Sequence, residues 1–112
     1  MRRLQSLLPA LFMAPLCSVA LAKAPKVEPI RASERVYYVQ GSGGMASRAN
    51  AAFNSNAAFV VTDDGVVVFD ALGSAALGAQ LRQAIARVTR QPIRRVIVSH
   101  YHADHFYGLQ SL

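Results

Sequence analysis

The chain has little cysteine, no tryptophan and few acidic residues. Its single cysteine, Cys17, lies in the apolar N-terminal run, so the rest of the chain has no disulfide, no thiol nucleophile and no thiolate ligand. Asp and Glu number 6 against 12 Lys and Arg, which gives a formal net charge of +6. No basic run is interleaved with aromatic residues, and this favours a solvated surface over a nucleic-acid-binding one. The composition therefore gives no support to a nucleic-acid partner.

Residues 1–22 have the pattern of a secretory signal peptide. Two arginines precede an apolar run from Leu4 to Leu21, and Ala20-Leu21-Ala22 is a small-x-small cleavage site. A membrane anchor is the alternative, but two prolines interrupt the run, and a bilayer span takes about 20 apolar residues. We therefore predict export to the periplasm or the medium, with no membrane contact after cleavage.

Residues 23–35 are predicted to form an extended leader and residues 36–112 a single domain. The leader contains two prolines and lacks apolar periodicity. The β-branched and aromatic run Val36–Val39 predicts a first strand. Residues 40–56 are rich in Gly, Ser, Ala and Asn and lack the lysine of a phosphate-binding loop, so we expect a flexible connection.

Two apolar runs, Ala57–Val61 and Val66–Phe69, predict a β-hairpin. Between them lies Thr62-Asp63-Asp64-Gly65, and Asp-Gly is a strong turn signal because both residues tolerate positive φ. The second run has no polar alternation, as expected of a strand covered on both faces. Asp70 follows it directly.

A helix is predicted after the hairpin, with Ser74 as its N-cap and Pro92 as its stop. Gly78 inside it costs about 1 kcal/mol relative to alanine, which is tolerable if the helix packs on a sheet. A buried strand at Val96–Val98 follows. The apolar residues of the helix fall on one stripe: Leu77, Leu81, Ala84, Ile85 and Val88.

Strand, helix and strand in this order make a βαβ unit, and the fold class is therefore α/β. The two strands should be parallel and joined by a right-handed crossover. Parallel strands have their carboxyl ends at one edge of the sheet, where ligand sites collect. Asp70 and His100 each follow such an end, so we expect Asp70 to lie near the histidines.

All three histidines of the chain fall within His100-Tyr101-His102-Ala103-Asp104-His105. Imidazole and carboxylate are the usual nitrogen and oxygen ligands of zinc. In an extended segment His100 and His102 lie on the same side and reach one ion. Asp104 and His105 follow at a bend that directs them to a second ion.

Catalytic zinc takes three protein ligands and keeps one position open for water. This loop supplies two ligands to each ion, which is half of a binuclear centre. A chance cluster of surface histidines and a purely structural metal site are the alternatives. The clustering of every histidine at one strand end, beside an acidic residue, favours metal ligation.

The loop has the form H-x-H-x-D-H and, with the element order of residues 36–112, resembles the metallo-β-lactamase superfamily. The resemblance implies an αβ/βα sandwich of which this chain is a truncated N-terminal half. It implies that His100 and His102 bind the first zinc ion and Asp104 and His105 the second. Asp70 would orient a ligand or a metal-bound water. A turn residue that caps the following segment is an equal alternative for Asp70.

One departure from the family pattern follows the loop. Members commonly continue D-H-x-G-G, whereas this chain has Phe106-Tyr107-Gly108, so Tyr107 replaces a residue that lets backbone approach closely. This departure bears on the shape of the pocket. The run His105–Gln110, with an export signal, is most similar to secreted zinc hydrolases associated with quinoprotein oxidation systems.

The function implied is that of an exported, zinc-dependent hydrolase acting on a small-molecule substrate. Metal-activated water would attack an ester, lactam or similar bond, and Asp104 would be the catalytic residue that helps to orient this water. As an N-terminal fragment, the chain alone is expected to be inactive. A truncated product without catalytic function and a basic binding module are the alternatives.

Overall fold

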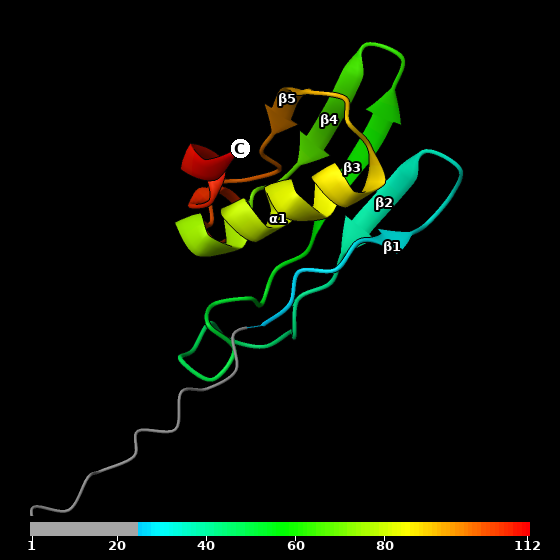
Figure 1. Ribbon diagram of the computed structural model, residues 1–112. Helices are drawn as coiled ribbons and strands as arrows, with labels where there is room; N and C mark the ends of the chain where they lie inside the picture. The colour runs from blue at the N-terminus through cyan, green and yellow to red at the C-terminus, as the bar shows by residue number, and fades with distance from the viewer. Residues whose placement is uncertain (1–24) are drawn as a thin grey trace, which may run out of the picture.

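The computed structural model describes residues 25–112, which form one five-stranded sheet with a long helix across it (Figure 1). The predicted signal peptide lies outside the described residues. Within residues 25–112, no helix combines the length and apolar character needed to cross a bilayer. In chain order the elements are β1 (Ile30–Arg31), β2 (Val36–Val39), β3 (Ala57–Thr62), β4 (Gly65–Phe69), α1 (Ala75–Val88), β5 (Ile93–Ile97), α2 (Ala103–Phe106) and a 3-10 turn (Leu109–Ser111).

The sheet has the order β1-β2-β3-β4-β5, antiparallel from β1 to β4 and parallel between β4 and β5. The predicted hairpin and βαβ unit are confirmed, and with them the α/β class. The turn differs in detail. Thr62 pairs with Gly65, so Asp63-Asp64 is the turn, and only Gly65 has a positive φ there, of 133°. The Thr62 hydroxyl stabilises this turn by accepting from the Asp64 N–H at 3.3 Å.

Helix α1 begins as predicted and ends earlier. The Ser74 hydroxyl accepts a hydrogen bond from the Leu77 N–H at 3.2 Å, which caps the N-terminus. The helix ends at Val88 rather than at Pro92, because Thr89 adopts an extended conformation. The Thr89 side chain then accepts from the Gln91 N–H at 3.2 Å, a local bond that competes with helix continuation.

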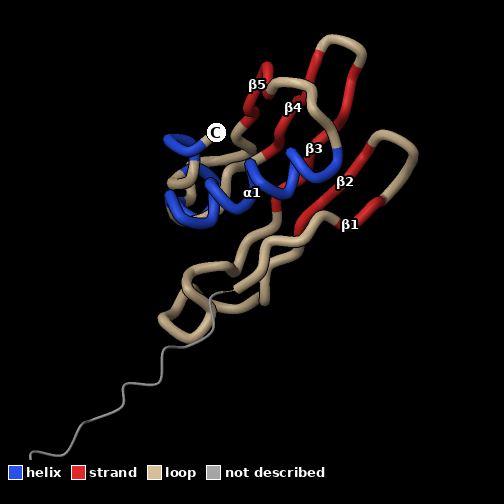
Figure 2. Tube along the Cα trace, viewed as in Figure 1, coloured by secondary structure: helices blue, strands red, loops and turns tan. Residues whose placement is uncertain are grey.

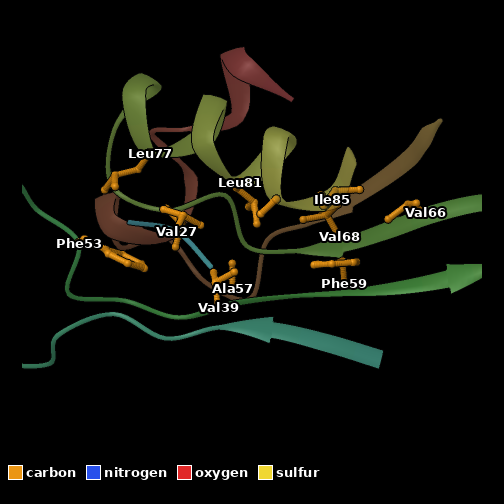
Figure 3. Packing of buried hydrophobic residues seen from close by; sticks show 12 residues of the cluster. Val27, Val39, Phe53, Ala57, Phe59, Val66, Val68, Leu77, Leu81 and Ile85 are labelled. Carbon is orange, nitrogen blue, oxygen red and sulfur yellow. The ribbon is translucent and has the colours of Figure 1, made fainter. Parts of the chain in front are cut away.

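The hydrophobic core lies between α1 and the face of the sheet it covers (Figure 3). The stripe predicted from helical spacing is buried from Leu77 to Ile85, and Val88 packs at its margin. Tyr37 stacks on Phe59 with ring centroids 5.1 Å apart, extending this layer onto β2. The sheet contributes Val39, Ala57, Phe59, Val66 and Val68 to the core.

From residue 25 onward, the predicted leader packs against the domain. Val27 is 2% exposed and belongs to the core. Its N–H donates to Gln80 Oε1 at 3.2 Å, and its carbonyl accepts from Arg87 Nη2 at 2.9 Å. Strand β1 then pairs with β2. One apolar residue that fits between helix and sheet therefore joins the leader to α1.

Strand β5 was predicted to be buried, and the structure leaves it largely exposed. Phe69 on β4 and Ile97 on β5 are neighbours in register and are 41% and 45% exposed. Val98, just beyond β5, is 37% exposed. Helix α1 covers the opposite face of the strands (Figure 2). An apolar face of the sheet therefore remains uncovered within residues 25–112.

Candidate metal centre

The parallel pairing of β4 and β5 brings Asp70 to the histidine loop. The Asp70 N–H donates to the Ile97 carbonyl at 2.8 Å, and the Ser99 N–H donates to Asp70 Oδ1 at 2.7 Å. Asp70 Oδ2 lies 2.8 Å from His105 Nδ1. The structure thus places the carboxylate against a predicted ligand, as well as at the turn that follows β4.

Asp70 is held as a carboxylate. Burial raises its pKa, but hydrogen bonds from the Ser99 N–H, His105 and the Ser99 hydroxyl outweigh this effect, so the pKa lies below its ordinary value. An ionised carboxylate can only accept, so Nδ1 of His105 carries the proton that faces Asp70, and in the neutral imidazole the lone pair is then on Nε2. A carboxylate in this position fixes the tautomer and ring orientation of a metal-ligating histidine.

Ser99 connects Asp70 to His100, a link that the sequence analysis missed. The Ser99 hydroxyl lies 2.8 Å from Asp70 Oδ2 and 2.9 Å from His100 Nδ1. Because its single proton goes to the carboxylate, the hydroxyl oxygen accepts Nδ1–H of His100. His100 Nε2 then carries a lone pair. The sequence shows only a serine between the strand and His100, and a serine at such a position is too common to indicate this contact.

The first pair of candidate ligands is His100 and His102. His100 Nε2 lies 3.0 Å from His102 Nδ1, so both imidazoles are on the same side of the chain. Zinc–nitrogen bonds of about 2.0–2.1 Å at a tetrahedral angle put two ligand nitrogens about 3.3 Å apart. The two nitrogens therefore fit a common zinc ion after a small opening of the pair.

The second pair is Asp104 and His105, on a single helical turn rather than at a simple bend. The His105 N–H donates to the His102 carbonyl at 2.9 Å, which starts α2. His105 Nε2 lies 3.7 Å from Asp104 Oδ2. The rings of His100 and His105 have centroids 4.1 Å apart, so the two pairs are adjacent.

The donor atoms come together as two pairs and not as a larger set. Within residues 25–112, no group of three or more His, Cys, Asp or Glu side chains is arranged to hold a metal ion. Nitrogen and oxygen donors of this kind match zinc chemistry, and two lone pairs at Nε2 are already oriented by Asp70 and Ser99. Each pair would supply two of the three protein ligands that a catalytic zinc ion takes.

The end of the Gly-rich loop contacts the site, although residues 40–56 were predicted to be a flexible connection. Phe53 is buried, at 5% exposure. Asn54 Nδ2 donates to Asp104 Oδ2 at 3.0 Å, and the Ser55 hydroxyl donates to the Asp104 carbonyl at 2.5 Å. Sequence reasoning missed both contacts, because no motif or periodicity relates residues so far apart along the chain.

Of the two glycines in the family pattern D-H-x-G-G, this chain lacks the first, at Tyr107, and keeps the second, Gly108. The close backbone approach is made by Gly108. Tyr107 is 57% exposed, so its side chain needs no room in the interior. Gly108 packs directly against Gly78 of α1 and the Ala71 carbonyl. The Gly108 N–H donates to the Leu72 carbonyl at 3.0 Å. The departure at Tyr107 therefore leaves the backbone packing behind the loop intact.

Comparisons with known proteins agree with this architecture. A sequence model of the metallo-beta-lactamase superfamily matches residues 50–112, which include Asp70 and the whole histidine loop. No curated protein matches the chain. A double mutant of the sec-alkyl sulfatase PisA1 is similar in structure, with a TM-score of 0.59 and 26% identity over 76% of this chain. The chain covers 12% of the length of that protein. On the match to more than half of its residues, the chain belongs to the metallo-β-lactamase superfamily.

Proposed function

We propose that this chain carries half of the binuclear zinc site of an exported hydrolase. The observation that carries the proposal is the pair His100 Nε2 and His102 Nδ1, 3.0 Å apart. The first of these nitrogens is left unprotonated by the Ser99 hydroxyl. Membership of a superfamily that includes hydrolases supports the reaction class.

In this proposal, His100 and His102 hold one ion, and Asp104 and His105 hold the other. Bound zinc lowers the pKa of a coordinated water to about 7 and polarises the scissile bond. Asp70 keeps the proton of His105 on Nδ1 and so keeps Nε2 available. The Asp104 carboxylate would accept a hydrogen bond from the attacking water and help to orient it toward the substrate.

The substrate in this proposal is a small molecule with a hydrolysable ester, lactam or similar bond. The structural neighbour is a sec-alkyl sulfatase, which adds sulfate esters to the classes worth testing. The exposed Tyr107 distinguishes this chain from members with two glycines after the loop. The run His105–Gln110 and the export signal are the basis on which we propose the type associated with quinoprotein oxidation systems. Assay of purified protein against esters, lactams and sulfate esters tests the substrate class.

Metal content should follow the two pairs. Zinc titration of the folded domain in its complete form is expected to show about two sites, with His102→Ala weakening one and His105→Ala the other, because each removes half of one pair. Elemental analysis and competition with a chromophoric chelator measure this, and Gln83→Ala, on the exposed face of α1, serves as the control. Equal loss of both ions in both histidine variants would argue against separable sites. A parent chain without metal would refute the proposal and favour a basic binding module.

Export is proposed from the N-terminal pattern of residues 1–22. Mass spectrometry of the periplasmic or secreted fraction is expected to find a chain that starts near Lys23, because cleavage follows the small-x-small site. Replacing Ala20 and Ala22 by bulky residues should block processing. An unprocessed chain starting at Met1 and confined to the cytosol would contradict export.

A further inference from the structure

We propose that Asn54 is a positioning residue for Asp104, fixing the carboxylate oxygen that faces His105. This inference rests on the proposed function, because it assigns Asn54 a role in the second metal site. Asn54 Nδ2 donates to Asp104 Oδ2 at 3.0 Å, and this same oxygen lies 3.7 Å from His105 Nε2. A carboxylate oxygen has two lone pairs, so Oδ2 can accept from the amide and also bind a metal ion.

Without Asn54, little else would hold the Asp104 side chain. The Ser55 hydroxyl donates to the Asp104 carbonyl and thereby fixes the backbone, but it leaves the carboxylate free to rotate. Within the described residues, the Asn54 amide is the one hydrogen-bond donor to that carboxylate. Its loss should therefore allow Asp104 to turn away from His105 while the backbone of α2 stays in place.

The unsatisfied Oδ1 of the half-buried Asn54 argues against a purely structural role. Its Oδ1 is buried and has no hydrogen-bond partner among the described residues. Leaving Oδ1 buried without a partner destabilises the fold by about as much as the hydrogen bond from Nδ2 to the charged Asp104 stabilises it. The net effect of Asn54 on stability is therefore small. The amide cannot be turned over, because Oδ1 would then face the Asp104 carboxylate. Asn54 therefore donates to Asp104 without a net gain in stability.

The experiment isolates the second site by using the His102→Ala background, which removes half of the first pair. In that background, Asn54→Leu preserves the size of the side chain and removes its polar atoms, and Asn54→Ala covers the case in which leucine does not fit. Asn56→Leu is the matched control, since Asn56 lies in the same loop, accepts from the Gly41 N–H and makes no hydrogen bond to Asp104 within the described residues. The probes are Zn²⁺ alone, by chelator competition, and Co²⁺ alone, by its d–d absorption.

We expect both Asn54 variants to bind Zn²⁺ about 10–100-fold more weakly, as loss of a partner to a ligating carboxylate commonly does, and to alter the Co²⁺ spectrum. Their metal-free urea unfolding midpoints should equal or exceed that of the parent. Asn54→Gln, which keeps the amide donor, should recover part of the affinity. Unchanged Zn²⁺ affinity in both variants would overturn this inference alone, as would equal weakening in Asn56→Leu. Absence of metal binding in the chain without any substitution would overturn the proposed function and this inference with it.

Discussion

Gly78→Ala should destabilise the chain, although alanine is the better helix former. A Cβ at residue 78 would overlap the Gly108 carbonyl oxygen and lie 2.8 Å from the Gly108 Cα. These are backbone atoms, and they cannot rotate away. Overpacking of this kind costs about 1–3 kcal/mol. In an exposed helix interior, the same substitution gains about 1 kcal/mol. The expected sign is therefore the reverse of the helix-propensity effect.

Gly108→Ala should have a similar effect for a reason that is also steric. Gly108 has a φ of −79°, which alanine adopts without strain, so backbone conformation does not require glycine here. A Cβ at residue 108 would overlap the Ala71 carbonyl oxygen. The Ala71 N–H donates to the His105 carbonyl at 2.7 Å. A shift of Ala71 that relieved this clash would therefore also shift the histidine loop. Zinc affinity should fall together with stability.

Urea unfolding of the metal-free chain measures both variants. Ala86→Gly, on the exposed face of α1, is the control and should lose about 1 kcal/mol from propensity alone. Gly78→Ala and Ala86→Gly are then both expected to lower the free energy of unfolding, although the substitutions are opposite. If Gly78→Ala raised the unfolding midpoint, the close packing of α1 on the segment after the loop would be refuted.

The βαβ unit could be predicted from the sequence because local signals specify each of its elements. The Ser74 cap, the apolar stripe of α1 and the run at Val66–Phe69 each specify their element independently of the rest. Parallel strands then place Asp70 beside the histidines by topology alone. The hydrogen bond between Asp70 and His105 agrees with that expectation.

The contacts that support the site could not be predicted in the same way. Asn54 and Ser55 reach Asp104 across a separation of about fifty residues, and nothing in their spacing encodes it. Burial of Val27 depends on a gap between helix and sheet that exists only after folding. A continuous apolar run predicts that a strand is buried, but it does not show which segment covers the strand. The exposure of β5 could therefore not be predicted.

The chain by itself is expected to show no measurable hydrolysis. In the proposed site, His100 and His102 would give the first ion two protein ligands, and Asp104 and His105 would give the second ion the same number. A catalytic zinc takes three. With fewer ligands the ion binds more weakly and the attacking water is not fixed, and a displacement of about 1 Å can reduce the rate 100-fold.

The uncovered sheet face adds to this expectation. Phe69 and Ile97 are 41% and 45% exposed, on the strands whose ends carry Asp70 and the histidine loop. The chain covers 12% of the length of the related sulfatase. A second sheet packed on this face would bury these side chains and make β4 and β5 more rigid. Ligands must be held within about 0.5 Å of their working geometry, which an uncovered sheet does not ensure.

Joining residues 23–112 to the C-terminal part of a complete superfamily member should therefore raise zinc content and produce turnover. The assay compares this fusion and the chain alone, each with and without His102→Ala, on ester, lactam and sulfate-ester substrates with zinc added. Turnover should appear only in the fusion, at least about 100-fold above the chain alone, and should be lost in its His102→Ala form. Turnover by the chain alone that disappears in His102→Ala would instead mean that two ligands per ion are enough, and that the described residues are a working active site.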